Sequence, residues 1–411
     1  MDPRTGEVLA MVSRPSFDPN KFAVRIKSSD WREIADNPDH PLLNRAIQAQ
    51  DAPGSTFKPF TAIAGLESGA IDDQFTVHCS GGASFYGSYH KCWWKPGHGA
   101  VSLHRGIVQS CDVYFYNVGD RTGIDKIAFY AHQAGFGQKT GIDLPHEAEG
   151  VVPSSEWKIR NFREKWYAGE TISVAIGQGA LTVTPMQLAR AYCWLANGGV
   201  WHQPHLVKGG QYQEHSWPLN PDNVAKVIYG TWGVVNEGGT GVRAQLPGLD
   251  VCGKTGTAQL ASNKFLSGKT GKEFEDNAWF AGFAPRQVPE IVVVALFEHG
   301  GHGQFAAPVA RDVMKAYFDK KARLAAEAES HRRAEPEKVS RLMRFGLPDL
   351  SNEIGPLEAK PQPIEAAFFS NTPASNLRRA GFSRRGASAP LHRILTIAAT
   401  PPRGAGSQRL P

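Results

Sequence analysis

Apolar and polar positions alternate or cluster in several short segments that are typical of strands. Residues 5–13 form such a segment between turn-rich stretches, so a strand is expected almost at the start of the chain. After Gly230 three more apolar segments are separated by polar, turn-rich stretches. Their spacing predicts antiparallel strands at 250–259, 277–284 and 290–298.

Other segments carry apolar residues at helical spacing. Residues 55–68 follow an Ala-Pro-Gly breaker, and the pattern predicts a helix with Ser55 at its N-terminus. Further helices are expected near 101–135 and 184–197, and a closing helix from about 308 to 325. This order predicts an α+β fold: an antiparallel sheet flanked by helices, with a mostly helical insert subdomain at about 63–200.

The domain is expected to occupy residues 1–325, and residues 326–411 are expected to form a tail without fixed structure. The 411-residue chain has a net charge of +6, but residues 371–411 hold seven arginines and no acidic residue. The first 370 residues therefore carry a net charge of −1. A nearly neutral body argues against a large phosphate-binding face, and no nucleic-acid partner is expected.

No segment of the sequence has the character of a membrane span. The longest unbroken apolar run is Ile291–Phe297, which is too short to cross a bilayer as a helix. The first residues also lack the charged and apolar regions of a secretory signal. An anchor is therefore expected to be absent from this chain, and any export signal would be encoded elsewhere.

Three short motifs occur in order, and together they indicate nucleophilic catalysis. They are Ser55-Thr56-Phe57-Lys58, Ser110-Cys111-Asp112 and Lys254-Thr255-Gly256-Thr257. A lysine three residues after a serine lies over the same helix face, so Lys58 is expected to reach Ser55 and take its proton. That role needs a lysine without its proton, which burial or a second cation such as Lys254 favours.

The other motif residues have separate expected roles. Ser110 could relay the proton to a leaving amine, and Asp112 could accept from a substrate amide or pair with Lys58. Gly256 would leave room for a backbone ligand beside the strand, while Thr255 and Thr257 would contact it. The main-chain amides of Ser55 and Thr257 could form an oxyanion hole.

The sequence resembles the transpeptidase domain of class B penicillin-binding proteins over roughly residues 2–320. The likeness is carried by the three motifs and by these flanking stretches: Asn44–Gln48, Ala52–Pro59, Thr140–Pro145, Ile176–Gly179, Thr184-Pro185 and Gly253–Gln259. Within that family, Asp112 in a Ser-x-Asp motif, Glu156–Lys158 and Gly169–Ile172 resemble the elongation enzyme, penicillin-binding protein 2. The division enzyme is the alternative.

This resemblance implies a D,D-transpeptidase that β-lactams acylate. Ser55 would attack the D-Ala-D-Ala stem peptide, release D-Ala, and pass the acyl group to the amine of a neighbouring stem. The family also implies a membrane glycosyltransferase and elongation-complex scaffold proteins as partners. Full-length members lie at the periplasmic face of the inner membrane, and their usual membrane helix and pedestal domain are missing from this sequence.

Cysteines and histidines cluster between residues 78 and 111. Cys79, Cys92, His98 and Cys111 would supply a closed Cys₃His set of the kind that structural zinc favours, within segment 79–111. A Cys79–Cys92 disulfide or unrelated thiols remain alternatives. Cys193 and Cys252 are interpreted as buried packing residues.

Rival functions share parts of these patterns. Residues 248–255 match the sequence pattern of a phosphate-binding P-loop. Such a loop needs a strand before it and a helix that begins at the threonine, and neither is expected here. A β-lactamase or a D,D-carboxypeptidase would use the same serine machinery with water as acceptor. A non-catalytic penicillin-binding scaffold would be expected to lack a motif member, and all are present.

Overall fold

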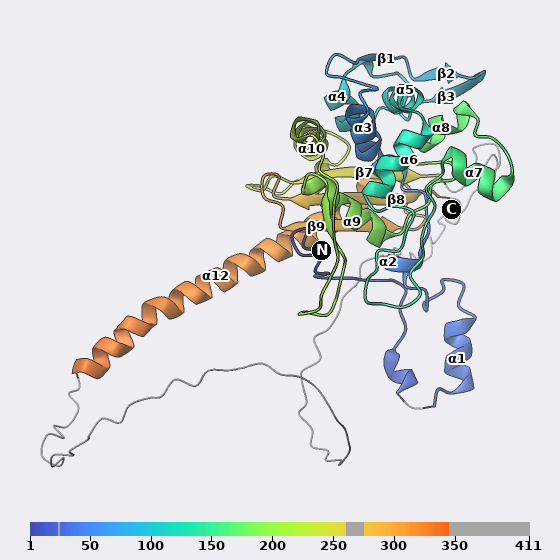
Figure 1. Cartoon of the computed structure of the whole chain (residues 1–411). Helices are drawn as coiled ribbons and strands as arrows, with labels where there is room; N and C mark the ends of the chain where they lie inside the picture. Colours follow the sequence, from blue (N-terminus) through green and yellow to red (C-terminus); the bar gives the residue numbers. More distant parts are fainter. Residues whose placement is uncertain (24, 260–274, 345–411) are drawn as a thin grey trace, which may run out of the picture. The chain divides into compact units, whose positions relative to one another are not determined.

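The computed structural model describes residues 1–23, 25–259 and 275–344. These residues fall into two units, Met1–Phe318 and 319–344. The first unit has an α+β architecture, with an antiparallel sheet that helices cover (Figure 1). The predicted fold class is confirmed.

The central sheet has three strands in the order β7-β8-β9, all antiparallel. Their bounds are Cys252–Ala258, Asn277–Ala284 and Ile291–Phe297, which confirms the three strands predicted after Gly230. Every residue of β8 is buried, as expected for a middle strand with both faces covered. Because β7 continues in extended form through Lys254 and Thr255, no helix opens there and the P-loop interpretation is excluded.

The predicted helix at 55–68 is present as two consecutive elements. A 3-10 turn, η2 (Gly54–Phe57), leads directly into α3 (Lys58–Glu67), almost all of which is buried. The Phe57 and Phe60 rings pack against Phe136, and Phe60 also packs against Tyr192 of α9 (Pro185–Ala196). The η2 turn, which carries Ser55 and is called the nucleophile turn below, is therefore fixed to the central core of the unit.

Two further helices lie beside this core. Helix α9 starts with a reciprocal capping box between Thr184 and Gln187, which satisfies two otherwise free amides. Helix α10 (Pro221–Asn236) packs against α3, α4 and β7. The remaining helical elements up to α10 are η1 Pro19–Phe22, α1 Ser28–Ala35, α2 Arg45–Gln48, α4 Leu103–Val108, α5 Asp112–Thr122, α6 Ile124–Gln133, α7 Ser155–Phe162 and α8 Ala168–Val174. After α10 come η3 Val242–Ala244 and η5 Gly303–Phe305.

The insert between residues 70 and 101 contains strands that its sequence pattern does not predict. Strands β1 (Val77–Cys79) and β4 (Gly99–Val101) pair with each other, as do β2 (Gly82–Phe85) and β3 (Ser88–Lys91). Each pair has only three or four residues per strand, too short for a clear apolar alternation. The insert is thus helical from α4 onward and carries small sheets before it.

The strand predicted at residues 5–13 is not formed. Glu7 makes only an isolated bridge with His205, next to the short pair β5 (Val200–His202) and β6 (Glu214–Ser216). The Met1 amine and carbonyl both bond to Val292 of β9, but the chain then leaves that strand. A strand needs a continuous backbone partner, and residues 5–13 have none among the described residues, which explains the wrong prediction.

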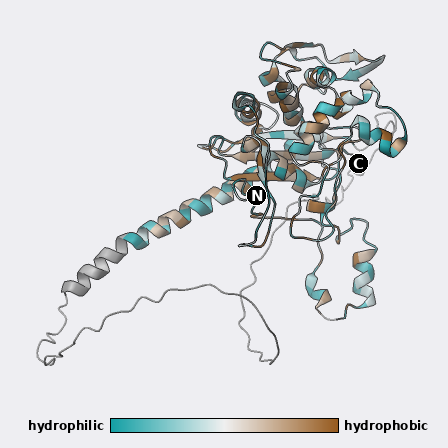
Figure 2. Ribbon diagram, viewed as in Figure 1, coloured by the Kyte–Doolittle hydropathy of each residue, from teal (hydrophilic) through white to brown (hydrophobic). Residues whose placement is uncertain are grey.

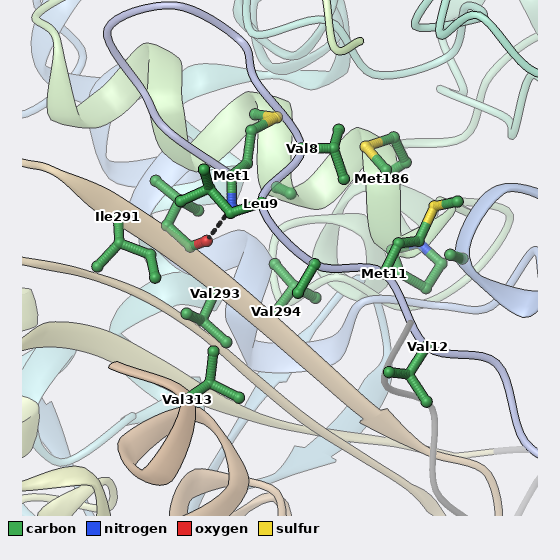
Figure 3. A pocket seen from close by; sticks show the side chains of 15 residues that line it. Met1, Val8, Leu9, Met11, Val12, Met186, Ile291, Val293, Val294 and Val313 are labelled. Carbon is green, nitrogen blue, oxygen red and sulfur yellow. Dashed lines mark hydrogen bonds between the residues drawn. The ribbon is translucent and has the colours of Figure 1, made fainter. Parts of the chain in front are cut away.

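An apolar pocket lies between this N-terminal segment and β9 (Figure 3). Its walls include Val8 and Met11 on one side and Val293 and Val294 on the other. Because all the residues that line it are apolar, the pocket supplies no acid, base or nucleophile. The candidate site lies elsewhere in the unit.

The closing helix is longer than predicted. Helix α12 runs from Ala307 to Arg344, so residues 326–344 are helical although they were expected to lack fixed structure. This stretch is rich in Ala, Glu and Arg, which favour a helix without apolar periodicity. The coloured part of α12 carries both hydrophilic and hydrophobic residues (Figure 2). The rest of the expected tail, from 345 to 411, lies outside the described residues. None of the helices in the described ranges combines the length and the apolar character needed to cross a bilayer.

Candidate active site

The Ser55 turn is placed by close backbone contacts that only glycine allows. Gly54 has φ +54°, and a Cβ on it would lie 2.6 Å from the Thr257 carbonyl. Its N–H donates to the Gly177 carbonyl at 2.9 Å, and a Cβ on Gly177 would collide with the Gly54 carbonyl. Ser55 is therefore held next to the end of β7 by main-chain geometry.

Lys58 lies at the centre of the motif residues, and its side chain is completely buried. Its Nζ donates to Asp112 Oδ1 at 2.6 Å, to the Ser110 carbonyl at 2.9 Å and to Ser110 Oγ at 3.2 Å. None of the hydrogen bonds of the described residues joins Nζ to Ser55 Oγ, so the predicted contact within the Ser-x-x-Lys motif stays a prediction. The predicted pairing of Lys58 with Asp112 is present in the structure.

Lys254 brings a second amine to the same hydroxyl. Its Nζ lies 2.8 Å from Ser110 Oγ and 3.2 Å from the Thr255 carbonyl. Burial lowers the pKa of Lys254 well below its usual value, and the neighbouring Lys58 charge lowers it further. Ser110 Oγ therefore lies between two amines, one of which gives up its proton readily, and such a chain can move protons.

The threonines of β7 bond to two turns outside the three motifs. Thr255 Oγ1 lies 2.6 Å from Thr240 Oγ1, and Thr257 Oγ1 accepts from the Gly303 amide at 3.2 Å. The second contact places the turn after β9 beside the end of β7. For Thr240, the glycines on either side of it were the signal of a tight turn before β7.

Gly256 packs closely against other parts of this chain on the side where a Cβ would lie. A Cβ there would lie 2.7 Å from the Pro53 carbonyl and 2.9 Å from Thr56 Cγ2, and Gly303 packs on its other atoms. The space that glycine leaves is thus filled by this chain's own backbone rather than kept for a ligand in that direction. Gln178, which was noted only as part of a family stretch, donates to the Thr257 carbonyl at 3.3 Å.

The predicted metal ligands converge. The donor atoms of Cys79, Cys92, His98 and Cys111 all lie within 4.8 Å of one another, and the four residues are buried. His98 Nδ1 is 3.7 Å from Cys79 Sγ and 3.5 Å from Cys92 Sγ. Cys79 ends β1, Cys92 and His98 lie in the loop between β3 and β4, and Cys111 directly precedes α5. Together they build one cluster, and its Cys₃His donor set fits tetrahedral zinc.

The remaining cysteine interpretations can be compared directly with the structure. All five cysteines are free thiols, including the pair considered as a disulfide. Cys193 and Cys252 are buried among apolar side chains, as predicted. The cluster joins the active site through Cys111, which lies between Ser110 and Asp112 in the chain.

Comparison with known proteins identifies the family to which this arrangement of motif residues belongs. Residues 1–315 match the family described as penicillin-binding protein transpeptidase domain. The chain is 42% identical over 329 residues to peptidoglycan D,D-transpeptidase MrdA of Acinetobacter baumannii, covering 76% of this chain and 49% of the relative. Identity to the MrdA of Escherichia coli K12 is 35% over 333 residues, covering 76% and 52%. The chain therefore spans about half the length of the curated relatives it matches.

Solved structures show the same likeness in three dimensions. A Pseudomonas aeruginosa PBP2 structure in complex with WCK 5153 matches with a TM-score of 0.71 and 38% identity, covering 77% of this chain and 69% of that one. PBP2 from Helicobacter pylori in complex with MreC matches with a TM-score of 0.70 and 31% identity, covering 77% and 59%. With the family motifs also assembled in one buried network, the chain belongs to the penicillin-binding protein transpeptidase domain family.

Proposed function

We propose that this protein is a peptidoglycan D,D-transpeptidase that acts through a Ser55 acyl-enzyme. The observation that carries the proposal is the buried network of Lys58, Asp112, Ser110 and Lys254 one helical turn from Ser55. Two lysines in a core cost stability, whereas a serine nucleophile needs a nearby base, and a second amine next to that base favours its neutral form.

Acylation follows from these positions. Ser55 Oγ attacks the carbonyl between the two D-alanines, and Lys58 takes the serine proton. The protonated lysine is then stabilised by Asp112 Oδ1, which lies 2.6 Å from Nζ. As the C–N bond breaks, Ser110 Oγ passes a proton to the leaving D-Ala amine, and its position between the two lysines lets it recover that proton.

Deacylation follows the same steps in reverse order, with an amine as the nucleophile. The side-chain amine of a second stem peptide attacks the ester carbonyl, a new C–N bond forms, and the bond to Ser55 Oγ breaks. The proton lost by the amine returns to Ser55 through Ser110 and Lys58. An extended stem peptide would pair with β7, whose edge opposite β8 has no strand partner in the described part of the chain.

Fluorescent penicillin labelling tests this proposal. A β-lactam places a carbonyl where the peptide carbonyl would lie, so the wild-type chain is expected to take up one covalent label that is released slowly. Ser55→Ala is expected to take up none, with an unchanged unfolding midpoint as the folding control. Persistent labelling of the variant would exclude Ser55 as nucleophile, and rapid drug hydrolysis by the wild type would indicate a β-lactamase.

We also propose a structural zinc ion in the Cys79, Cys92, His98 and Cys111 cluster. The four residues would hold the ion and fix the loop that carries Ser110 and Asp112; the ion itself would take no part in proton transfer. Purified protein is expected to contain one zinc per chain. Cys79→Ser is expected to lose zinc and lower the unfolding midpoint, whereas Cys193→Ser, outside the cluster, is expected to keep the metal.

The cellular setting of the relatives suggests that of this protein. We infer a place at the periplasmic face of the inner membrane during cell elongation, with a membrane glycosyltransferase and a scaffold protein as partners. The H. pylori PBP2 structure with MreC supports a scaffold partner of this kind. Co-purification of the tagged protein with a glycosyltransferase from membranes would test the inference, and recovery with cytoplasmic proteins alone would contradict it.

A further inference from the structure

Trp93 is tied to the second motif although more than half of its side chain is exposed. It follows Cys92 in the loop between β3 and β4, with 53% of its surface accessible. Its indole N–H donates to the carbonyls of Gln109 at 3.0 Å and Ser110 at 3.1 Å. Its main-chain N–H donates to Asp112 Oδ2 at 2.8 Å. One residue therefore bonds to both ends of the Ser-x-Asp motif.

The Trp93 indole bonds to Ser110, a residue whose backbone conformation is energetically unfavourable. Ser110 has φ +55°, a left-handed conformation that residues with a side chain rarely adopt. Such a conformation persists only when its surroundings hold it. The Ser110 carbonyl accepts from Lys58 Nζ and from the Trp93 indole, so Trp93 helps hold the conformation that places Oγ between the two lysines.

The main-chain N–H of Trp93 bonds to Asp112, which pairs with Lys58, the proposed general base. Asp112 uses Oδ1 for Lys58 and Oδ2 for the Trp93 amide, so its carboxylate is fixed at both oxygens. A carboxylate held only at Oδ1 could rotate away from the lysine. The loop after Cys92 thus sets the orientation of the group that stabilises protonated Lys58.

We propose that Trp93 is a positioning residue for acyl transfer, acting through Ser110 and Asp112. The inference rests on the proposed function, because it assigns a role within that reaction. The adjacent Trp94 offers a matched control: its side chain is exposed to a similar degree, at 47%, and makes no hydrogen bond among the described residues. The two tryptophans therefore differ in their bonds to the motif rather than in size or exposure.

The test compares Trp93→Phe with Trp94→Phe in β-lactam acylation. Phenylalanine keeps an aromatic ring and the main-chain N–H, but it removes the indole donor and part of the ring system. Trp94→Phe makes the same change in ring size without losing a hydrogen bond to the motif. The maximal acylation rate of Trp93→Phe is expected to fall about tenfold, as expected when a single bond that positions the reacting groups is lost. The drug concentration giving half the maximal rate is expected to change less than twofold, and Trp94→Phe is expected to resemble the wild type in both quantities.

Hydrogen exchange measures the positioning role without depending on activity. Amides 110–113 are expected to exchange faster in Trp93→Phe than in Trp94→Phe, with equal zinc content and unfolding midpoints in the two variants. Equal exchange in both would overturn the inference, whether or not the protein is labelled. Equal maximal acylation rates would also overturn it, while absent labelling of the wild type would reject the proposed function and leave the exchange result to decide on Trp93.

Discussion

At the scale of single residues, the site is defined by charges placed where solvent cannot reach them. Lys58 and Lys254 are fully buried, and Asp112 pairs directly with Lys58. Ionised groups in a core cost stability unless they are paired, so this arrangement is not explained by folding alone. Another acid, the partly buried Asp51, lies four residues before Ser55 and accepts from Asn277 Nδ2 at 2.9 Å.

Asp51 predicts a dependence of stability on pH. Burial, and then the Glu298 carboxylate, raise the pKa of Asp51 to about 6. An acid whose pKa is higher in the folded state binds its proton more tightly there, so its contribution is full below about pH 4 and is lost as the pH rises through about 6. Asp51→Asn removes the charge and keeps an acceptor for Asn277. The variant should be more stable than the wild type by about 2 kcal/mol at pH 8 and nearly equal at pH 4.

Chemical denaturation at the two pH values checks this prediction. Asp36→Asn, at an exposed position, serves as the matched control and is expected to show no such change. A variant Asp51→Asn that is equally stable or less stable at pH 8 would show that the carboxylate is not penalised by its surroundings.

At the scale of elements, the nucleophile turn depends on glycine contacts between η2, β7 and the loop at 176–179. Gly177 has φ +79°, and a Cβ there would collide with the Gly54 carbonyl. Gly179 has nearly the same conformation, φ +75°, but a Cβ there would make only ordinary contacts, with Ser173 Cβ at 3.4 Å and Val174 Cγ2 at 3.6 Å as the nearest atoms. These two glycines separate the cost of the backbone conformation from the cost of the close contact.

We expect Gly177→Ala to impair acylation much more than Gly179→Ala. Both variants should lose about 1 kcal/mol of stability because alanine is disfavoured in a left-handed conformation, and Gly177→Ala should lose more because its Cβ collides with the Gly54 backbone. Only Gly177→Ala displaces Gly54 and therefore Ser55, so its acylation rate should be at least tenfold lower than that of Gly179→Ala. Penicillin labelling kinetics and thermal unfolding measure the two effects, and similar kinetics in both variants would show that the contact is not needed.

The elements that sequence reasoning predicted well are those whose pattern reflects burial. Strand β8 matches its predicted bounds, because an unbroken apolar segment between turn residues has few alternatives. Residues 5–13 have a similar pattern but lack a continuous backbone partner in the described part of the chain, and a pattern alone does not show whether such a partner exists. The end of α12 was missed for the opposite reason, since its later residues favour a helix by their intrinsic propensity although their sequence has no apolar periodicity.

At the scale of the whole molecule, the site joins segments far apart in the chain. Motif resemblance found the residues of these segments, because their types and order are distinctive. The contacts of Trp93, Thr240 and Gln178 could not be predicted, since they depend on how loops without periodicity return to the motifs. The cysteine cluster was predicted from density and residue type, and its convergence required the folded insert.

The packing of α12 predicts where the chain can be shortened. Ala307, Ala310 and Met314 are buried against the sheet, and Phe318 packs beside them. A chain that ends at Ala325 should keep the unfolding midpoint and the acylation rate of the full chain. A chain that ends at Asp312 loses Met314 and Phe318 and should be less stable by several kcal/mol. Thermal unfolding of both chains checks this, and equal midpoints would show that α12 does not contribute to the core.

The interlocked backbones of Gly54, Gly177 and Thr257 have a consequence for drug resistance under the proposed function. Substitutions act on side chains, whereas these contacts are made by the main chain, so few mutations can shift Ser55 without also disabling cell-wall synthesis. Escape from an antibiotic would then have to arise on the walls of the cleft, at positions that an inhibitor touches and the natural peptide does not.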